Sequence, residues 1–496
     1  MSIKYCLIHN NESILIDLIP ILNFNDFNEV LSNILVNEYL LSAFFADPEA
    51  KELYAVCSNN QNGSIKIIRT KIDDNKFESF TNNFPQAHLF EREIFETTKI
   101  EPLNHPWLKS VRFPKNSKSK IGDIPFFKIE GDEIHEVGVG PVHAGVIEPG
   151  HFRFQCHGET VYHLEISLGY QHRGFEKMLV NAPNSSTRHL MEIASGDATI
   201  GHVTAYAQLI ESLTKTQVSM YDNILRSVLL ELERCANHVG DVGALAGDAG
   251  FMPTQQFCGR IRGDFLNMTA MICGNRFGRD VIVPGGVNYQ INEEIAADLS
   301  QKISLGLKEF LDAARLMFDN PTVVSRLESI GTVSKDDALA IGMVGPAARA
   351  SGIIRDIRHD YPSGNYCFAN IPVASKISGT VFARAYVKWL ETQSSVKFIL
   401  EQLAKLKKIN NSKKQSKTIT TPLAKNAISV SLCEGWRGEI CHVAITNANS
   451  KFRMYKIYDP SFHNWLGLAL SLREQQISDF PLCNKSFNLS YCGHDL

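Results

Sequence analysis

Hydrophobic and polar positions along the chain follow two periods, and the change between them suggests where one kind of structure gives way to another. Residues 24–47, FNDFNEVLSNILVNEYLLSAFFAD, carry apolar side chains at helical spacing and predict a helix. Residues 51–60 and 63–72 alternate as strands do, and residues 88–100 predict a second amphipathic helix. The front of the chain is therefore predicted to be a small α/β domain.

A polar, lysine-rich stretch at residues 114–123, PKNSKSKIGD, is typical of a linker. We therefore expect two domains, residues 1–118 and residues 119–496. Strand-like segments open the second domain, and from about Ser185 the pattern becomes mainly helical. Residues 428–460 then alternate again and predict a β-hairpin or meander. The predicted fold class is α+β: a small α/β domain, then a mainly helical domain with a β-rich start and a β-hairpin near its C-terminus.

Composition narrows the classes of function. Hydrophobic residues make up 44% and charged residues 21% of the 496 positions, which is ordinary for a globular protein with a sizeable core. A formal net charge of −3 gives no electrostatic reason to expect a nucleic-acid partner. No apolar run approaches the roughly 18 residues of a membrane span, and the N-terminus does not resemble a signal peptide. We expect a cytoplasmic protein without a membrane span of its own.

Eleven cysteines are scattered along the chain, and none of them forms a C-x-x-C pair. That pair is the spacing favoured by zinc, iron–sulfur and thiol-redox sites. A disulfide framework is not expected in the cytosol. Most of these cysteines are therefore predicted to be small buried hydrophobic residues.

Four segments in order carry a family resemblance: GPVHAGVIEPGHFRF from Gly140, LEISLGYQHRGFEKML from Leu164, ELERCANHVGDVGALAGDAGF from Glu231 and GNRFGRDVIVPGGV from Gly274. Together they resemble the quinone-site, 49-kDa-type subunit of respiratory complex I and the large subunit of membrane-bound, energy-converting [NiFe] hydrogenases. Residues 90–114 resemble the end of the 30-kDa-type subunit of complex I. A fusion of the two is the arrangement of the formate hydrogenlyase large subunit.

The resemblance implies a nickel–iron site whose ligands this chain lacks. The hydrogenases hold the metals with two C-x-x-C pairs, because thiolates suit these soft metals. Counting back from His202 in MEIASGDATIGH places Ser195 and Ala198 at the first pair. Matching the C-terminal tail without gaps places Ser490 and Gly493 at the second pair. Cys492 is one residue away from the ligand position at Gly493. We therefore expect no metal bound by this chain and no standard nickel–iron centre.

The resemblance to complex I implies half of a quinone site. His143 and Asp248 match the histidine and carboxylate that pair there, and we predict them as a proton-donor pair, since the carboxylate would raise the imidazole pKa. The tyrosine that would hold the other quinone oxygen falls on Gly196. Two structural alternatives stay open: His143 would satisfy backbone carbonyls in a loop, and Asp248 would cap a helix end.

The remaining candidates are expected to line the cavity that the resemblance implies. Arg173 is expected to raise the reduction potential of a neighbouring cluster; its alternative is an ion pair with Glu176, three residues further along a helix. Ser195 to Asp197 have an alternative role as an N-cap segment. The predicted cavity-lining residues are Arg173, Glu176, Ser195, Gly196, Asp197, Ala198, His202, Ser490 and Gly493.

The resemblance implies a peripheral subunit of a membrane-bound oxidoreductase complex related to complex I and energy-converting hydrogenases. Its partners would be an iron–sulfur subunit and membrane-embedded subunits that move ions, so the chain would sit on the cytoplasmic side of the inner membrane through them. The chain itself would bind no cofactor, and a quinone is the candidate small molecule. Three alternatives stay open: a quinone reductase with an altered headgroup site, a catalytically silent structural subunit, and a hydrogenase with the unorthodox ligands Asp197, His202 and Cys492.

Overall fold

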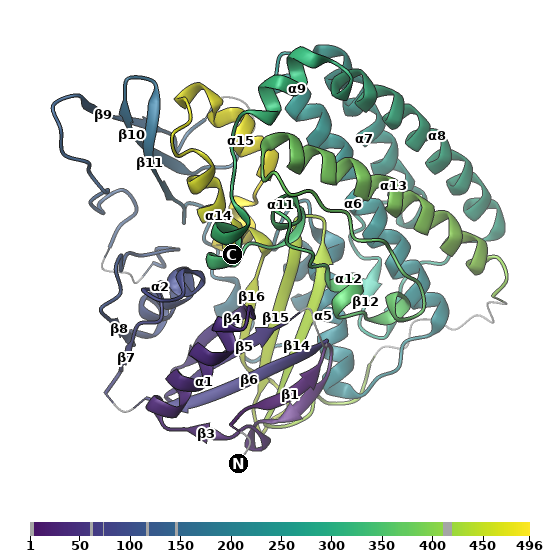
Figure 1. Ribbon diagram of the computed structural model, residues 1–496. Coiled ribbons are helices and arrows are strands. Elements are labelled where there is room, and N and C mark those ends of the chain that lie inside the picture. Colours follow the sequence, from purple (N-terminus) through teal and green to yellow (C-terminus); the bar gives the residue numbers. More distant parts are fainter. Residues whose placement is uncertain (1–3, 60–62, 73, 116–118, 144–146, 410–418) are drawn as a thin grey trace.

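The computed structural model describes residues 4–59, 63–72, 74–115, 119–143, 147–409 and 419–496. Figure 1 shows the N-terminal sheet at the bottom, long helices on the right and a small three-stranded sheet at the upper left. Helices and strands are both numerous, and most strands lie in other parts of the chain than the long helices. The predicted α+β class is therefore confirmed.

The N-terminal domain packs two helices, α1 (Phe24–Val36) and α2 (His88–Thr98), around a five-stranded sheet. The strand order is β1-β6-β5-β4, and β3 pairs with β6. The strands are β1 (Cys6–His9), β3 (Ile21–Leu22), β4 (Leu40–Asp47), β5 (Glu52–Ser58) and β6 (Ser64–Lys71), with β7 (Lys76–Glu78) paired to β8 (Glu101–Leu103). The strands predicted at 51–60 and 63–72 and the helix predicted at 88–100 are confirmed, with residue 60 outside the described residues.

The single helix predicted over residues 24–47 is wrong in its second half. Asn23 caps α1 by accepting a hydrogen bond from the Asp26 N–H at 2.8 Å, and α1 ends at Val36. The strand β4 follows, and all eight of its residues are buried. A strand buried on both faces has a continuous apolar run rather than alternation, so periodicity alone does not separate it from a buried helix.

The predicted β-rich start of the second domain is confirmed as a three-stranded antiparallel sheet in the order β11-β10-β9. Its strands are β9 (Ile134–Val139), β10 (His151–His157) and β11 (Thr160–Ser167). Residues 116–118 of the predicted linker lie outside the described residues, as does the last residue of the predicted first domain. The boundary between residues 118 and 119 stays a prediction.

The predicted C-terminal meander is confirmed by β14 (Ala427–Gly435), β15 (Gly438–Thr446) and β16 (Phe452–Tyr458). An N-terminal strand, β2 (Ser13–Leu15), extends this sheet by pairing with β14. Side chains of the meander and of α14 (Pro460–Ser471), such as Val430, Val443 and Phe462, belong to the same apolar core as the N-terminal domain. The two parts of the chain therefore share a sheet and a core.

The second domain is built around α6 (Met220–Asp248), which packs against α7 (Met252–Cys273), α8 (Glu293–Phe318) and α13 (Val381–Leu406), as Figure 1 shows. Most residues of α6 are buried. Within the described ranges, no helix is both long and apolar enough for a membrane span. The other helices are α3 (Phe175–Met178), α4 (Thr187–Glu192), α5 (Thr199–Thr214), α7 (Met252–Cys273), α8 (Glu293–Phe318), α9 (Pro321–Glu328), α10 (Lys335–Ala340), α11 (Gly345–Ala350), α12 (Ile357–Asp360), α13 (Val381–Leu406), α14 (Pro460–Ser471), α15 (Phe480–Phe487) and α16 (Tyr491–Asp495), with a two-stranded ribbon of β12 (Ile282–Val283) and β13 (Gly286–Val287).

Candidate functional site

Two segments almost 300 residues apart meet at a pair of serines. Ser195 lies in the turn between α4 and α5, and Ser490 is the N-cap of α16. The Ser195 hydroxyl donates to the Ser490 Oγ at 2.9 Å, and both side chains are buried. The Ser490 Oγ also accepts from the Gly493 N–H at 2.9 Å, as N-cap side chains do. Two of the positions at which the resemblance places metal-binding cysteines are therefore in direct contact as hydroxyls.

The side chains at the other two such positions have no atom that could bind a metal ion. Ala198 is buried, and its N–H donates to the Ser195 carbonyl at 3.2 Å. At Gly493, an added Cβ would lie 2.7 Å from Cγ and 2.8 Å from Oδ2 of Asp459. A side chain at this position would require Asp459 to move, because real Cβ contacts are longer than this. The four positions together offer two hydroxyls, one methyl group and no thiolate. They therefore do not fit a nickel–iron centre, which needs thiolate ligands.

His202 takes part in a buried chain of hydrogen bonds. Its Nε2 lies 3.0 Å from Asp459 Oδ2, and its Nδ1 lies 3.1 Å from His442 Nε2. His442 Nδ1 in turn lies 2.8 Å from the Tyr455 hydroxyl. Burial opposes ionisation of Asp459, but His202 and Arg437 outweigh it and hold the Asp459 pKa below its usual value. Both ring nitrogens of His202 are thus occupied, and neither is free for a metal.

Asp197 is held by an arginine that the sequence did not single out. Arg437, in the turn between β14 and β15, donates to both Asp197 carboxylate oxygens at 2.5 and 2.8 Å and to the Asn488 carbonyl at 2.5 Å. The Asp197 carbonyl accepts from Trp436 Nε1 at 2.9 Å and from Asn237 Nδ2 at 3.0 Å. Arg437 therefore joins the turn at Ser195 to the C-terminal tail, and the only sequence signal was an arginine within a glycine-bounded GWRG turn.

Gly196, where the resemblance would place a tyrosine, is exposed. An added Cβ would meet no heavy atom within 4 Å. The position beside the buried serine pair is therefore open, in contrast to the crowded Gly493.

Arg173 and Glu176 do not form the ion pair that was the alternative reading of their spacing. Arg173 precedes α3 and donates to the carbonyls of Ile193 at 2.7 Å, Ala194 at 2.8 Å and Cys492 at 3.0 Å. Burial lowers the pKa of Arg173. Glu176 lies inside α3 and binds Lys456 Nζ at 2.5 Å instead. Because the helix begins only after Arg173, the three-residue spacing does not place both side chains on one helical face.

His143 and Asp248 do not contact each other in the part of the chain that the structure describes. His143 Nε2 lies 2.9 Å from the Gly150 carbonyl, in the manner of the backbone-satisfying alternative. Asp248 is the last residue of α6. Burial raises the pKa of Asp248, and Lys485 acts in the opposite direction. The predicted pair is therefore not formed in this structure, and the proton-handling role of either residue stays a prediction.

Glu148, which sequence reasoning missed, connects the β9–β10 loop to α16. Its carboxylate oxygens accept from the N–H groups of Cys492 at 3.3 Å and Tyr491 at 3.4 Å, at the helix N-terminus that favours negative charge. Burial and Glu148 raise the pKa of the Cys492 thiol to about 11, so the thiol stays protonated at neutral pH. Among the described residues no group of three or more His, Cys, Asp or Glu side chains is arranged to hold a metal ion.

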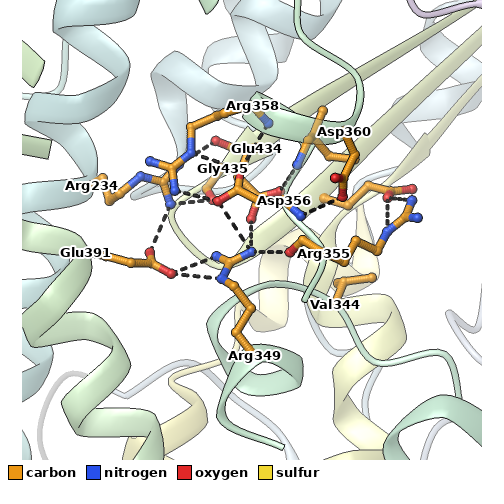
Figure 2. A network of polar contacts seen from close by, with 12 residues as sticks. Arg234, Val344, Arg349, Arg355, Asp356, Arg358, Asp360, Glu391, Glu434 and Gly435 are labelled. Atoms are coloured by element: carbon orange, nitrogen blue, oxygen red, sulfur yellow. Dashed lines mark hydrogen bonds and ion pairs between the residues drawn. The ribbon is translucent and has the colours of Figure 1, made fainter. Parts of the chain in front are cut away.

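A buried network of charges supports the turn that carries Arg437 (Figure 2). Arg234 of α6 donates to the carbonyls of Glu434 at 2.7 Å and Gly435 at 3.1 Å. Arg349 of α11 joins the carboxylates of Glu434 and Glu391, each at 2.9 Å. Burial and the neighbouring Asp356 raise the pKa of Glu434 to about 7. The network fixes the end of β14 and, through it, the position of Arg437.

Glu233 makes the stability near this site dependent on pH. Its carboxylate accepts from the N–H groups of Ile200 at 2.7 Å and Gly201 at 3.2 Å, yet burial raises its pKa to about 8. Between the unfolded value near 4.3 and about 8, the folded chain holds a proton that the unfolded chain has released. The free energy of unfolding should therefore fall by up to about 1.4 kcal/mol per pH unit as pH rises through this window.

Urea unfolding of Glu233→Gln at several pH values should show this slope reduced relative to the parent chain. The matched control, Glu328→Gln at the exposed end of α9, should leave the slope unchanged. Equal slopes for the parent chain and Glu233→Gln would show that Glu233 is ionised in the folded state.

Comparisons with known proteins agree with the architecture. Residues 248–495 match the family of the respiratory-chain NADH dehydrogenase 49-kDa subunit, and residues 13–125 match that of the 30-kDa subunit. Formate hydrogenlyase subunit 5 of Escherichia coli (strain K12) is 26% identical over 489 residues, covering 92% of this chain and 84% of that protein. Carbon monoxide-induced hydrogenase of Rhodospirillum rubrum is 27% identical to this chain, and the match covers 71% of this chain and 97% of that protein. A chain of the membrane-bound sulfane sulfur reductase, an archaeal respiratory membrane complex, has the same fold, with a TM-score of 0.67 at 22% identity over 73% of this chain and 99% of that chain.

Proposed function

The chain belongs to the family of the 49-kDa subunit of respiratory-chain NADH dehydrogenase, with a 30-kDa-type domain fused in front of it, and on this premise we propose that it serves electron transfer in a membrane-bound complex without a nickel–iron centre. It would be a peripheral subunit on the cytoplasmic side, and the electron transfer would be coupled to movement of ions by membrane-embedded partners.

The observation that carries the proposal is the contact between Ser195 and Ser490. The two segments that the resemblance assigns to metal binding come together with a 2.9 Å hydrogen bond between hydroxyls. Neutral hydroxyls are poor ligands for nickel, and thiolates are the donors that such a centre needs. The crowding at Gly493 supports the same conclusion, because its neighbour Asp459 occupies the space that a cysteine side chain would need.

We further propose that the electrons come from iron–sulfur clusters in a partner subunit, with no cofactor held by this chain. Arg173 supports a position close to such a partner, since its guanidinium is anchored on three carbonyls near the exposed residues Ile193 and Gly196. A fixed positive charge near a cluster raises the cluster's reduction potential.

A quinone is the second candidate, as the acceptor rather than as a resident cofactor. The open space at Gly196 favours it, because the position that would carry a tyrosine clamp has no side chain and no neighbour within 4 Å of a Cβ. The headgroup would then have to be held by other groups, with His143 as the proposed proton donor.

The test of a role in electron transfer is His143→Gln in the assembled complex. General acid–base catalysis contributes about 10²–10⁴-fold, so we expect oxidation of reduced methyl viologen by a water-soluble ubiquinone analogue to fall about 100-fold while assembly is unchanged. His157→Gln, on an exposed part of β10, is the matched control and should leave turnover unchanged. Unchanged turnover in His143→Gln would contradict the proposed role of His143 and favour a purely structural subunit.

A further inference from the structure

A pocket whose lining includes neither Ser195 nor Ser490 lies where the N-terminal domain meets the second domain. It is lined by residues of α2, the following segment around 105–111, β11 and α14, and its volume is about 430 Å³. Small-molecule sites usually have about 300–1,000 Å³ and occur preferentially where domains meet. Nothing in the proposed electron transfer uses this pocket.

The pocket carries one positive charge that is not neutralised by a direct partner. Arg92 of α2 donates to the carbonyls of Lys109 at 2.8 Å and Ser110 at 3.0 Å. None of the ion pairs found among the described residues includes Arg92, and burial lowers its pKa to about 10. Lys109 is paired with Glu165 at 2.6 Å. An anion next to the Arg92 guanidinium would relieve the cost of this partly desolvated charge.

Three of the four histidines that line the pocket, His88, His105 and His163, add hydrogen-bonding groups without adding charge. Burial lowers the pKa of His88 to about 3 and that of His105 to about 4, and it also lowers the pKa of His163. All three are therefore neutral at physiological pH. His494 also lines the pocket and is paired with Asp495 at 2.9 Å, and Lys109 is paired with Glu165. The positive charge of the lining that lacks a carboxylate partner is therefore that of Arg92.

Aromatic side chains supply much of the remaining surface. Trp107 and Phe126 line the pocket from the segments that follow α2, and Trp465 lines it from α14. Trp465 is 3% exposed, and its indole N–H has no hydrogen-bond partner within the described ranges. A buried indole N–H usually has a partner, so a ligand acceptor atom would satisfy it.

We propose that this pocket binds a flat aromatic anion, such as an aromatic carboxylate, with the acidic group at Arg92 and the Trp465 N–H and the ring against Trp107 and Phe126. The guanidinium selects the negative charge, since it offers a planar fork of donors to a carboxylate. The apolar walls select the ring. A neutral aromatic molecule of the same shape would lose the interaction that distinguishes the site.

Isothermal titration of the purified chain with 2-naphthoate and with its neutral analogue 2-naphthalenemethanol tests this proposal. We expect 2-naphthoate to bind at least tenfold more tightly than the alcohol. Arg92→Met should remove this preference, and Arg92→Lys should keep part of it. Arg260→Met, at an exposed ion pair on α7, is the control and should change neither affinity.

A second variant keeps the test independent of the structural role of Arg92. Ala469 of α14 lines the pocket, and Ala469→Phe would fill part of it. We expect this variant to lose binding of both probes. The proposal is overturned if 2-naphthoate does not bind at millimolar concentration, if it binds no more tightly than the alcohol, or if Ala469→Phe binds it as the parent chain does.

Discussion

Arg349→Met should lower the free energy of unfolding by about 3–5 kcal/mol, the cost of removing one partner from a buried ion pair. Arg349 is 1% exposed and lies between the carboxylates of Glu391 and Glu434. Without the guanidinium, both carboxylates lose a charge-assisted hydrogen bond in a site that water does not reach. The effect is measured by urea unfolding of the purified chain at pH 7.

Arg260→Met is the matched control for Arg349→Met. Arg260 also joins two carboxylates, those of Asp264 and Glu309 at 2.7 Å each, but its side chain is 51% exposed. Exposed pairs contribute about 0–1 kcal/mol, so the control should change the unfolding free energy by no more than that. A loss below about 1 kcal/mol in Arg349→Met would contradict the buried network as a source of stability.

Lys388→Met should have an effect of similar size, and it should act on the C-terminal tail. Lys388 of α13 donates to Asp241 at 2.5 Å and to the Ser486 carbonyl at 2.9 Å, and Asp241 also accepts from Asn488 at 2.6 Å. Loss of the ammonium group leaves Asp241 buried without its counter-charge, at a cost of about 3–5 kcal/mol. The tail that carries Ser490 would lose one of its anchors to α13, while Arg384 would still donate to the Ser486 hydroxyl.

Hydrogen exchange locates this second effect. Amides of α15 and α16 should exchange faster in Lys388→Met than in the parent chain, whereas those of α8 should be unchanged. Lys302→Met is the control, since Lys302 pairs with Asp298 on the exposed face of α8. The double variant Lys388→Met, Asp241→Leu should recover stability, because it removes both charges together. Uniformly faster exchange throughout the chain would contradict a local anchoring role.

The sequence predicted the parts of this fold that local pattern determines. The β9–β11 sheet lies at the start of the second domain, where strand-like segments were predicted. The strands of the C-terminal meander lie where alternation predicted them, and α2 lies where its apolar spacing predicted it. Leu40–Asp47 was assigned to a helix because a strand buried on both faces has no alternation to detect. The pairing of β2 with β14 depends on residues more than 400 positions apart, and no local pattern signals it.

The candidate site, like the fold, could be predicted from the sequence only in part. The family resemblance, rather than any spacing, drew attention to Ser195 and Ser490, and the structure brings the two into contact. It did not indicate Arg437 or Glu148, whose contacts arise only when the β14–β15 turn and the β9–β10 loop fold against the tail. The resemblance favoured a pair of His143 with Asp248, whereas His143 lies 2.9 Å from the Gly150 carbonyl, as the structural alternative for this residue predicted.

Metal content of the purified native complex, measured by mass spectrometry of nickel and iron, tests the central claim most directly. The account predicts iron at the level of the partner's clusters and nickel far below one atom per chain, because Ser195, Ala198, Ser490 and Gly493 offer no thiolate. Nickel near one atom per chain, retained after dialysis against a chelator, would contradict it and would require a ligand set elsewhere in the protein.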